Sequence, residues 1–156
     1  MSRNCSGVIS AGLAAILLAG CNSGEETAAD ETAGSLQLGA LGAPDIERHE
    51  IYGTVCGFRE AGGSIRALAL IQPEQAWLKL DGEAVALPVA DDAGEGPLGI
   101  GLSYTAAPAN LSLAVEGEEK ASGGGRSETG ATLTVRTAAG DTAELSGTLQ
   151  CSSGSV

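Results

Sequence analysis

The chain has 156 residues and a formal net charge of −12 at pH 7, because 20 acidic side chains outnumber 8 basic ones. This charge argues against binding to nucleic acid, whose phosphates attract Lys and Arg, and against electrostatic docking on anionic lipid. It is typical of a solvated acidic surface, and it would also attract a basic protein partner. Beyond an N-terminal leader and linker about a hundred residues remain, enough for one domain with a modest core.

The first 20 residues predict a secretory signal peptide. Arg3 is the only charged residue before Cys21, and the run Gly7–Leu18 is almost entirely apolar. This run is too short to span a bilayer as a mature helix, and it is followed by the small residues Ala19 and Gly20. We therefore expect the chain to be exported.

The four residues Leu18–Cys21, with the sequence Leu-Ala-Gly-Cys, resemble the lipobox of bacterial lipoproteins. The resemblance implies cleavage before Cys21 and a diacylglycerol on its sulfur, so that acyl chains hold the protein on a membrane. A core cysteine is the alternative, but it fits poorly because the polar run Asn22–Glu26 follows at once. In Gram-negative lipoproteins an Asp after the cysteine typically retains the protein at the inner membrane. Asn22 therefore implies the outer membrane there, and otherwise the outer face of the plasma membrane.

Residues 21–46 are expected to form the lipidated cysteine and a flexible acidic tether. From Asn22 to Pro44 the chain contains acidic, Ala, Gly and Thr residues but no basic or aromatic residue. Such a segment cannot bury enough apolar surface to fold alone. Leu36, Leu38 and Leu41 alternate weakly, which leaves open a short edge strand.

A β-domain is predicted over residues 47–152, followed by a disordered tail at 153–156. Short apolar runs alternate with polar residues and are separated by Gly, Asp and Pro, which predicts seven to eight antiparallel strands and no helix. The sequence does not decide whether these strands form a small β-sandwich or a β-barrel. Strands are expected at 51–58, 64–71, 76–80, 83–87, 99–105, 111–116, 132–136 and 142–151.

Three local patterns guide the assignment of elements within this domain. Asp81-Gly82 lies between two alternating runs, which is a strong signal for a β-hairpin. Residues 118–128 contain three consecutive glycines and predict a long exposed loop. The run 64–71 is apolar on both faces, so a central strand is favoured there and a short helix remains the alternative.

Cys56 and Cys151 are expected to form a disulfide. Export places them in an oxidising compartment, where such a pair usually becomes oxidised. The bridge would join the first and last strands of the domain and stabilise it by about 4–5 kcal/mol in the chain-entropy model. A redox or zinc site is disfavoured because the chain lacks Cys-x-x-Cys and has a single histidine, His49.

No pattern in the chain predicts catalysis, a cofactor or a metal site. Gly94–Gly99 matches G-x-G-x-x-G, but an acidic loop precedes it and a strand is expected after it, so no helix is placed to hold a pyrophosphate. Asp91, Asp92 and Glu95 are clustered, yet their spacing is not that of an EF-hand, and a solvated loop is favoured over a calcium site. A catalytic triad would have to be assembled around His49 from distant residues. We expect a protein that is not an enzyme.

Trp77 and Tyr104 are the candidate binding residues. Trp77 shares a strand face with Lys79, opposite Leu78 and Leu80. On an outward face Trp77 would be an exposed aromatic anchor for a partner. The alternative is that it packs under a loop or against a second sheet.

The run from Cys56 through 76–82 to Leu87-Pro88, with Cys151 at the end, is similar to membrane-bound inhibitors of C-type lysozyme. The resemblance implies a lipoprotein with a small antiparallel β-barrel. The family's inhibitory Ser-Gly-x-x-Tyr segment is not reproduced, since this chain has Asp92-Ala93-Gly94 there and its next Tyr is Tyr104, so no inhibitory residue is carried over.

The layout of tether, β-domain and cysteine pair also looks like mycobacterial LpqH-type surface antigens. Together these patterns lead us to expect a lipid-anchored, non-enzymatic domain that binds a partner or supports the envelope. The alternative is an inhibitor of a C-type lysozyme or of another basic cell-wall hydrolase, and a small hydrolase ranks last.

Overall fold

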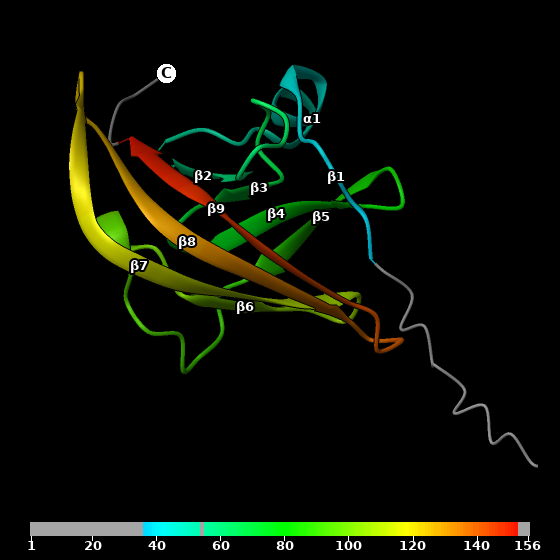
Figure 1. Ribbon diagram of the computed structural model, residues 1–156. Helices are drawn as coiled ribbons and strands as arrows, with labels where there is room; N and C mark the ends of the chain where they lie inside the picture. Colours follow the sequence, from blue (N-terminus) through cyan, green and yellow to red (C-terminus); the bar gives the residue numbers. More distant parts are fainter. Residues whose placement is uncertain (1–35, 54, 153–156) are drawn as a thin grey trace, which may run out of the picture. The chain divides into compact units, whose positions relative to one another are not determined.

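The computed structural model describes residues 36–53 and 55–152. The predicted signal peptide, Cys21, the tether as far as residue 35 and the tail 153–156 lie outside the described residues. Within these ranges the chain is mostly antiparallel strand, and one curled sheet forms a half-barrel (Figure 1). The all-β prediction is therefore confirmed. In these ranges no helix has both the length and the apolar character needed to cross a bilayer.

The described residues form nine strands, one α-helix and one short 3-10 turn. In chain order they are β1 (Leu38–Gly39), α1 (Ala43–His49), β2 (Val55–Glu60), β3 (Ala69–Ile71), β4 (Gln75–Leu80), β5 (Glu83–Pro88), η1 (Pro97–Gly99), β6 (Ser103–Thr105), β7 (Ala109–Gly123), β8 (Arg126–Thr137) and β9 (Thr142–Ser152).

The strands follow the order β1-β4-β3-β2-β9-β8-β7-β6, and β5 pairs along the other edge of β4. The N-terminal strands β1–β5 thus meet the C-terminal strands β6–β9 where β2 pairs with β9. The two groups meet a second time at an isolated bridge between Val89, just after β5, and Tyr104 in β6. The sheet therefore curls back on itself, and its concave side encloses the main core.

The predicted disulfide is confirmed. Cys56 and Cys151 face each other in the β2–β9 register and are joined by an S–S bond. Both side chains are buried in the main core. The bridge thus joins the two groups of strands at their long junction.

The main core consists of the alternating apolar side chains on the concave side. The Asp81-Gly82 hairpin is confirmed as β4 and β5, and it contributes Leu78 and Leu87. Phe58, Leu111, Leu133 and Leu149 are contributed by the other long strands. Residues of this kind have high transfer free energies, so their burial is the principal stabilising contribution to the half-barrel.

The structure differs from the expected tether over residues 36–46. Leu38 pairs with Leu80, Leu41 is buried, and α1 begins at Ala43. The helix has recognisable start signals, namely Pro44 in its first turn and Asp45 two residues after its first residue. It was missed because seven residues are too few to show a helical apolar period.

The predicted loop 118–128 is instead the end of a long hairpin. β7 continues to Gly123 and β8 begins at Arg126, with a turn at Gly124 and Gly125, whose φ angles are 61° and 72°. The polar sequence hid this extension, because its strands pair by backbone hydrogen bonds while their side chains remain mostly exposed. The glycines are required by the left-handed turn.

Two other predicted strands are shorter in the structure. Only Ala69–Ile71 of the run 64–71 is strand, and only Ser103–Thr105 of the run 99–105. Ile65 is 88% exposed, so the apolar character of the first run does not reflect burial along its whole length.

Candidate ligand-binding groove

Trp77 lies on the outer, convex face of the sheet, where α1 covers it. With Leu41, Ile51 and Leu70 it forms a second buried cluster, separate from the main core. The His49 ring packs on Trp77 with 4.6 Å between ring centroids. Trp77 is therefore not an exposed anchor. It is covered by a helix, where the alternative had expected a loop or a second sheet. Its indole Nε1 is buried and has no hydrogen-bond partner among the described residues.

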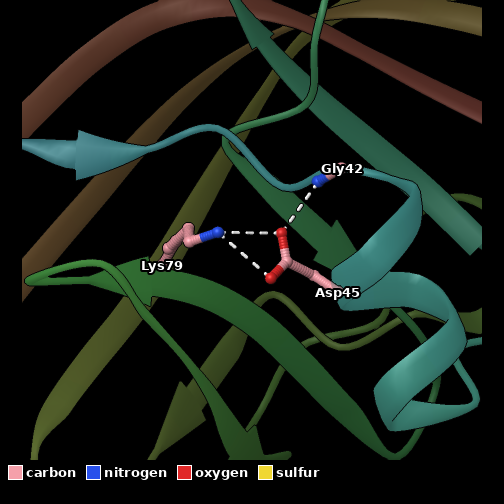
Figure 2. A network of polar contacts seen from close by, with 3 residues as sticks. All are labelled: Gly42, Asp45 and Lys79. Carbon is pink, nitrogen blue, oxygen red and sulfur yellow. Dashed lines mark hydrogen bonds and ion pairs between the residues drawn. The ribbon is translucent and has the colours of Figure 1, made fainter.

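An ion pair fastens α1 to the sheet (Figure 2). Lys79 Nζ in β4 lies 3.1 Å and 3.0 Å from the two carboxylate oxygens of Asp45. The Gly42 N–H donates a further hydrogen bond to Asp45 Oδ2, at 3.0 Å. This N–H and, next, the Lys79 ammonium lower the pKa of Asp45. Lys79 therefore shares the outer face with Trp77, as predicted, and serves to hold the helix over it.

A groove of about 440 Å³ lies on this outer face beside α1. Its volume falls within the range of small-molecule sites in proteins. Residues from α1, the segment after it, β2, the segment before β3, β3 itself, β8 and β9 line the groove. They are Ile46, Ile51, Tyr52, Gly53, Val55, Gly57, Arg59, Ile65, Ala67, Leu70, Arg126, Gln150, Cys151 and Ser152.

Gly57 explains why the sheet is hollow here. It lies in β2 between Leu70 of β3 and Gln150 of β9 in the pairing register. Its neighbours along the strand, Cys56 and Phe58, point into the main core, so Gly57 belongs to the outer face. Because glycine has no side chain, Gly57 leaves a depression on the outer face between the apolar residues on the β3 side and the polar residues on the β8 side.

The two walls differ in chemistry. Ile46, Ala67 and Leu70 give an apolar wall, with the exposed side chain of Ile65 at its rim. Arg59 in β2 and Arg126 in β8 bring positive charge to the groove, and among the described lining residues there is no Asp or Glu. A groove with apolar and cationic walls is unusual for a chain in which acidic residues outnumber basic ones by 20 to 8.

Tyr104, the other predicted binding residue, is also buried. Only 1% of it is exposed, and its hydroxyl donates to the Gln72 carbonyl at 2.8 Å and accepts from the Gly101 N–H at 2.9 Å. Burial raises the pKa of Tyr104 to about 12. The residue fixes the closure of the sheet and is not a surface anchor.

The predicted carboxylate cluster does not form a metal site in the described part of the chain. Across residues 36–53 and 55–152, no three His, Cys, Asp or Glu side chains gather so that they could hold an ion. Asp91 and Asp92 lie in the exposed segment after β5. His49 packs against Trp77.

The groove was missed by sequence reasoning. A glycine inside a strand is a signal for a close approach or a hollow, and Gly57 between two core residues gives that signal. The segments that surround Gly57 are placed there by α1 and by the pairing of β2 with β9. No local sequence pattern fully specifies the helix or this pairing.

Comparison with known proteins gives no match, since no protein-family model, curated protein or solved structure is significantly similar to this chain. The resemblances to lysozyme inhibitors and to LpqH-type antigens therefore remain predictions. The features that bear on function are therefore the groove and the N-terminal residues Leu18–Cys21.

Proposed function

We propose that this protein is a lipid-anchored, non-enzymatic binding protein of a bacterial cell envelope, and that its ligand site is the groove beside α1. The groove is the observation that carries the proposal. Its volume and its mixture of apolar and charged lining residues are those of sites that bind small organic molecules. The lipobox-like residues Leu18–Cys21 support the location, with the membrane as a partner through acyl chains on Cys21.

Exposed apolar groups at the groove support binding over a purely structural role. Ile65 is 88% exposed and Tyr52 is 51% exposed, and both line the groove. Neighbouring exposed apolar side chains around a concavity often mark an interaction site. A ligand that covers them would remove apolar surface from water.

The binding proposal can be tested with a neutral apolar probe, N-phenyl-1-naphthylamine, whose fluorescence rises in an apolar site. The protein used is the chain 22–156, which keeps every described residue. We expect saturable binding to the natural sequence and its loss in Gly57→Leu, whose side chain would fill the groove. Gly57→Ala is the matched control, because a Cβ there would lie 3.6 Å from the Ala67 Cβ and 3.8 Å from Leu70 Cδ2, ordinary contact distances. Equal probe binding by the Leu and Ala variants would contradict the proposal.

The anchor can be tested in a bacterial host that expresses the full chain. We expect the natural chain in the membrane fraction, and in a two-membrane host in the outer membrane. Cys21→Ser should leave the chain outside that fraction and without incorporated labelled palmitate. Cys5→Ser is the control, since Cys5 lies in the predicted signal peptide and should have no effect. Absence of palmitate label from the natural chain, or label that survives Cys21→Ser, would contradict lipidation of Cys21.

The second candidate function is inhibition of a C-type lysozyme or another basic cell-wall hydrolase. The exposed Glu118 and Glu119 on the β7–β8 hairpin, together with the net charge of −12, favour a basic protein partner. The test is a titration of C-type lysozyme activity with the chain 22–156 at low and at physiological salt. Stoichiometric inhibition at both salt concentrations would support this function. Inhibition only at low salt would reflect unspecific attraction between opposite charges, and would count against it.

A further inference from the structure

We infer that the groove binds a single-chain anionic amphiphile of the fatty-acid type, with its acyl chain against the apolar wall and its carboxylate at Arg126. This inference rests on the proposed binding function and names the chemical class of the ligand.

The groove carries positive charge in a protein whose net charge is negative. Arg59 and Arg126 are two of the 8 basic residues of the chain, and both line the groove. Arg66 lies next to the lining residues Ile65 and Ala67 in the sequence. No carboxylate is among the described lining residues, so the groove is locally cationic in a strongly acidic protein. An anionic ligand would be attracted to it and repelled by the rest of the surface.

The Arg59 guanidinium is already engaged in an ion pair, and the Arg126 guanidinium is available to a ligand. Arg59 lies 3.6 Å from the Glu128 carboxylate in β8, so a groove ligand would have to compete with Glu128 for it. Arg126 forms no ion pair with any described residue. It is exposed and lies opposite Ser152 in the β8–β9 register, and both residues line the groove. A guanidinium can hold a carboxylate through two parallel hydrogen bonds.

The remaining lining residues divide the groove into an apolar part and a polar part. Ile46, Val55 and Ala67 pack against the cluster that contains Leu70 and give the groove its apolar part. This part borders β9, because Val55 pairs with Ser152 and Gly57 pairs with Gln150. A ligand with one long apolar portion and one charged end matches this division. A small inorganic anion would leave the apolar wall in water, and a neutral hydrocarbon would leave Arg126 without a counter-charge.

The experiment compares decanoate with decanol, which share one alkyl chain and differ in charge. Binding to the chain 22–156 is measured by calorimetry at about pH 8, where the carboxylate is ionised, and below micelle-forming concentrations. We expect decanoate to bind about tenfold more tightly than decanol, the factor that corresponds to one modest charge-assisted contact. Arg126→Gln should remove this preference and leave decanol binding unchanged.

Two further variants make the assignment specific. Arg136→Gln is the matched control, because Arg136 is an exposed arginine on the same strand and its loss changes the net charge equally, but it does not line the groove. It should leave the preference for decanoate intact. Glu128→Gln would release Arg59 from its ion pair and should strengthen decanoate binding several-fold, with decanol again unchanged.

The outcomes separate this inference from the function on which it rests. Equal binding of decanoate and decanol, both abolished by Gly57→Leu, would overturn the anionic specificity and leave a general apolar binding groove. Loss of the preference in Arg136→Gln as strongly as in Arg126→Gln would overturn the role of Arg126. Failure of both ligands and of the naphthylamine probe to bind would overturn the proposed function itself.

Discussion

At the scale of single residues, the two predicted binding aromatics are both structural. Trp77 packs beneath α1, and Tyr104 lies where the sheet closes on itself. The apolar pattern of the expected strand 99–105 is consistent with burial of Tyr104, and both Tyr104 and Ile100 are buried. What the pattern could not show is the pair of backbone partners of its hydroxyl, because Gln72 belongs to a distant part of the chain. An aromatic residue with a satisfied polar tip is a common solution for a buried corner.

Tyr104→Phe should destabilise the protein without changing its fold. The Gln72 carbonyl and the Gly101 N–H would each lose a hydrogen bond, at a cost of about 1–3 kcal/mol in the free energy of unfolding. Urea unfolding measures this cost, and Tyr52→Phe is the control because Tyr52 is half exposed. An effect no larger than that of Tyr52→Phe would contradict the role of Tyr104 in closure.

The raised pKa of Tyr104 gives a second signature in alkali. The unfolded chain ionises Tyr104 near the ordinary value of 10, whereas the folded protein holds the proton to about 12. The contribution of this group to stability is therefore fully present below pH 10 and is lost as the pH rises toward 12. The decline in stability over that interval should be smaller in Tyr104→Phe than in the natural chain.

At the scale of elements, α1 is the segment that creates the site. It covers the second cluster and gives the groove Ile46, and it is fastened by Asp45 and Lys79 (Figure 2). The hairpin of β4 and β5 was predictable because Asp-Gly and the alternation lie in one continuous stretch. The helix was not, because its stability comes from an ion pair between residues 34 positions apart and from packing on Trp77, which lies 28 positions after His49. Tertiary contacts of this kind have no counterpart in local sequence.

Asp45→Asn should loosen α1 and expose Trp77. Because Trp77 is the only tryptophan of the chain and lies beneath α1, tryptophan fluorescence reports on the cluster that the helix covers. We expect a red-shifted emission maximum at pH 7 in Asp45→Asn, while Asp92→Asn, an exposed control, should leave the spectrum unchanged. An identical spectrum for Asp45→Asn would show that packing alone holds the helix.

Acid should have the same effect on the natural chain. The pKa of Asp45 is lowered in the folded protein, so its contribution to stability is present above the ordinary value of 3.8 and is lost as the pH falls below it through the folded pKa. A red shift of Trp77 emission below pH 4 that is absent in Asp45→Asn would identify this carboxylate as the titrating group.

At the scale of the whole molecule, two junctions hold the half-barrel together. The N-terminal strands meet the C-terminal strands along β2 and β9 (Figure 1). The Cys56–Cys151 disulfide lies at this junction, and the two groups meet again at the bridge between Val89 and Tyr104. The cysteine pairing was predictable from the expected export and from the number of cysteines, because only one pair remains after Cys21. The curling of one sheet, in place of two packed sheets, was not, because alternation of apolar residues is the same in both forms.

Removal of the disulfide by the double variant Cys56→Ala/Cys151→Ala should weaken the first junction. The bridge spans a sequence separation of 95 residues, and its loss should lower the free energy of unfolding by roughly 4–5 kcal/mol in the chain-entropy model. Denaturant unfolding of both proteins gives the difference. An unchanged midpoint would show that strand pairing alone holds the junction.

The long β7–β8 hairpin has a consequence for behaviour at high concentration. Beyond Leu113, β7 pairs only with β8 among the described strands, so its other edge offers unpaired backbone groups to a second chain. Such edges can template intermolecular sheets and fibres. Here Glu116, Glu118, Glu119 and Lys120 lie along that stretch and are exposed. Lipid anchoring as proposed would crowd many copies into one plane, and this charged border would keep neighbouring molecules from growing into a shared sheet.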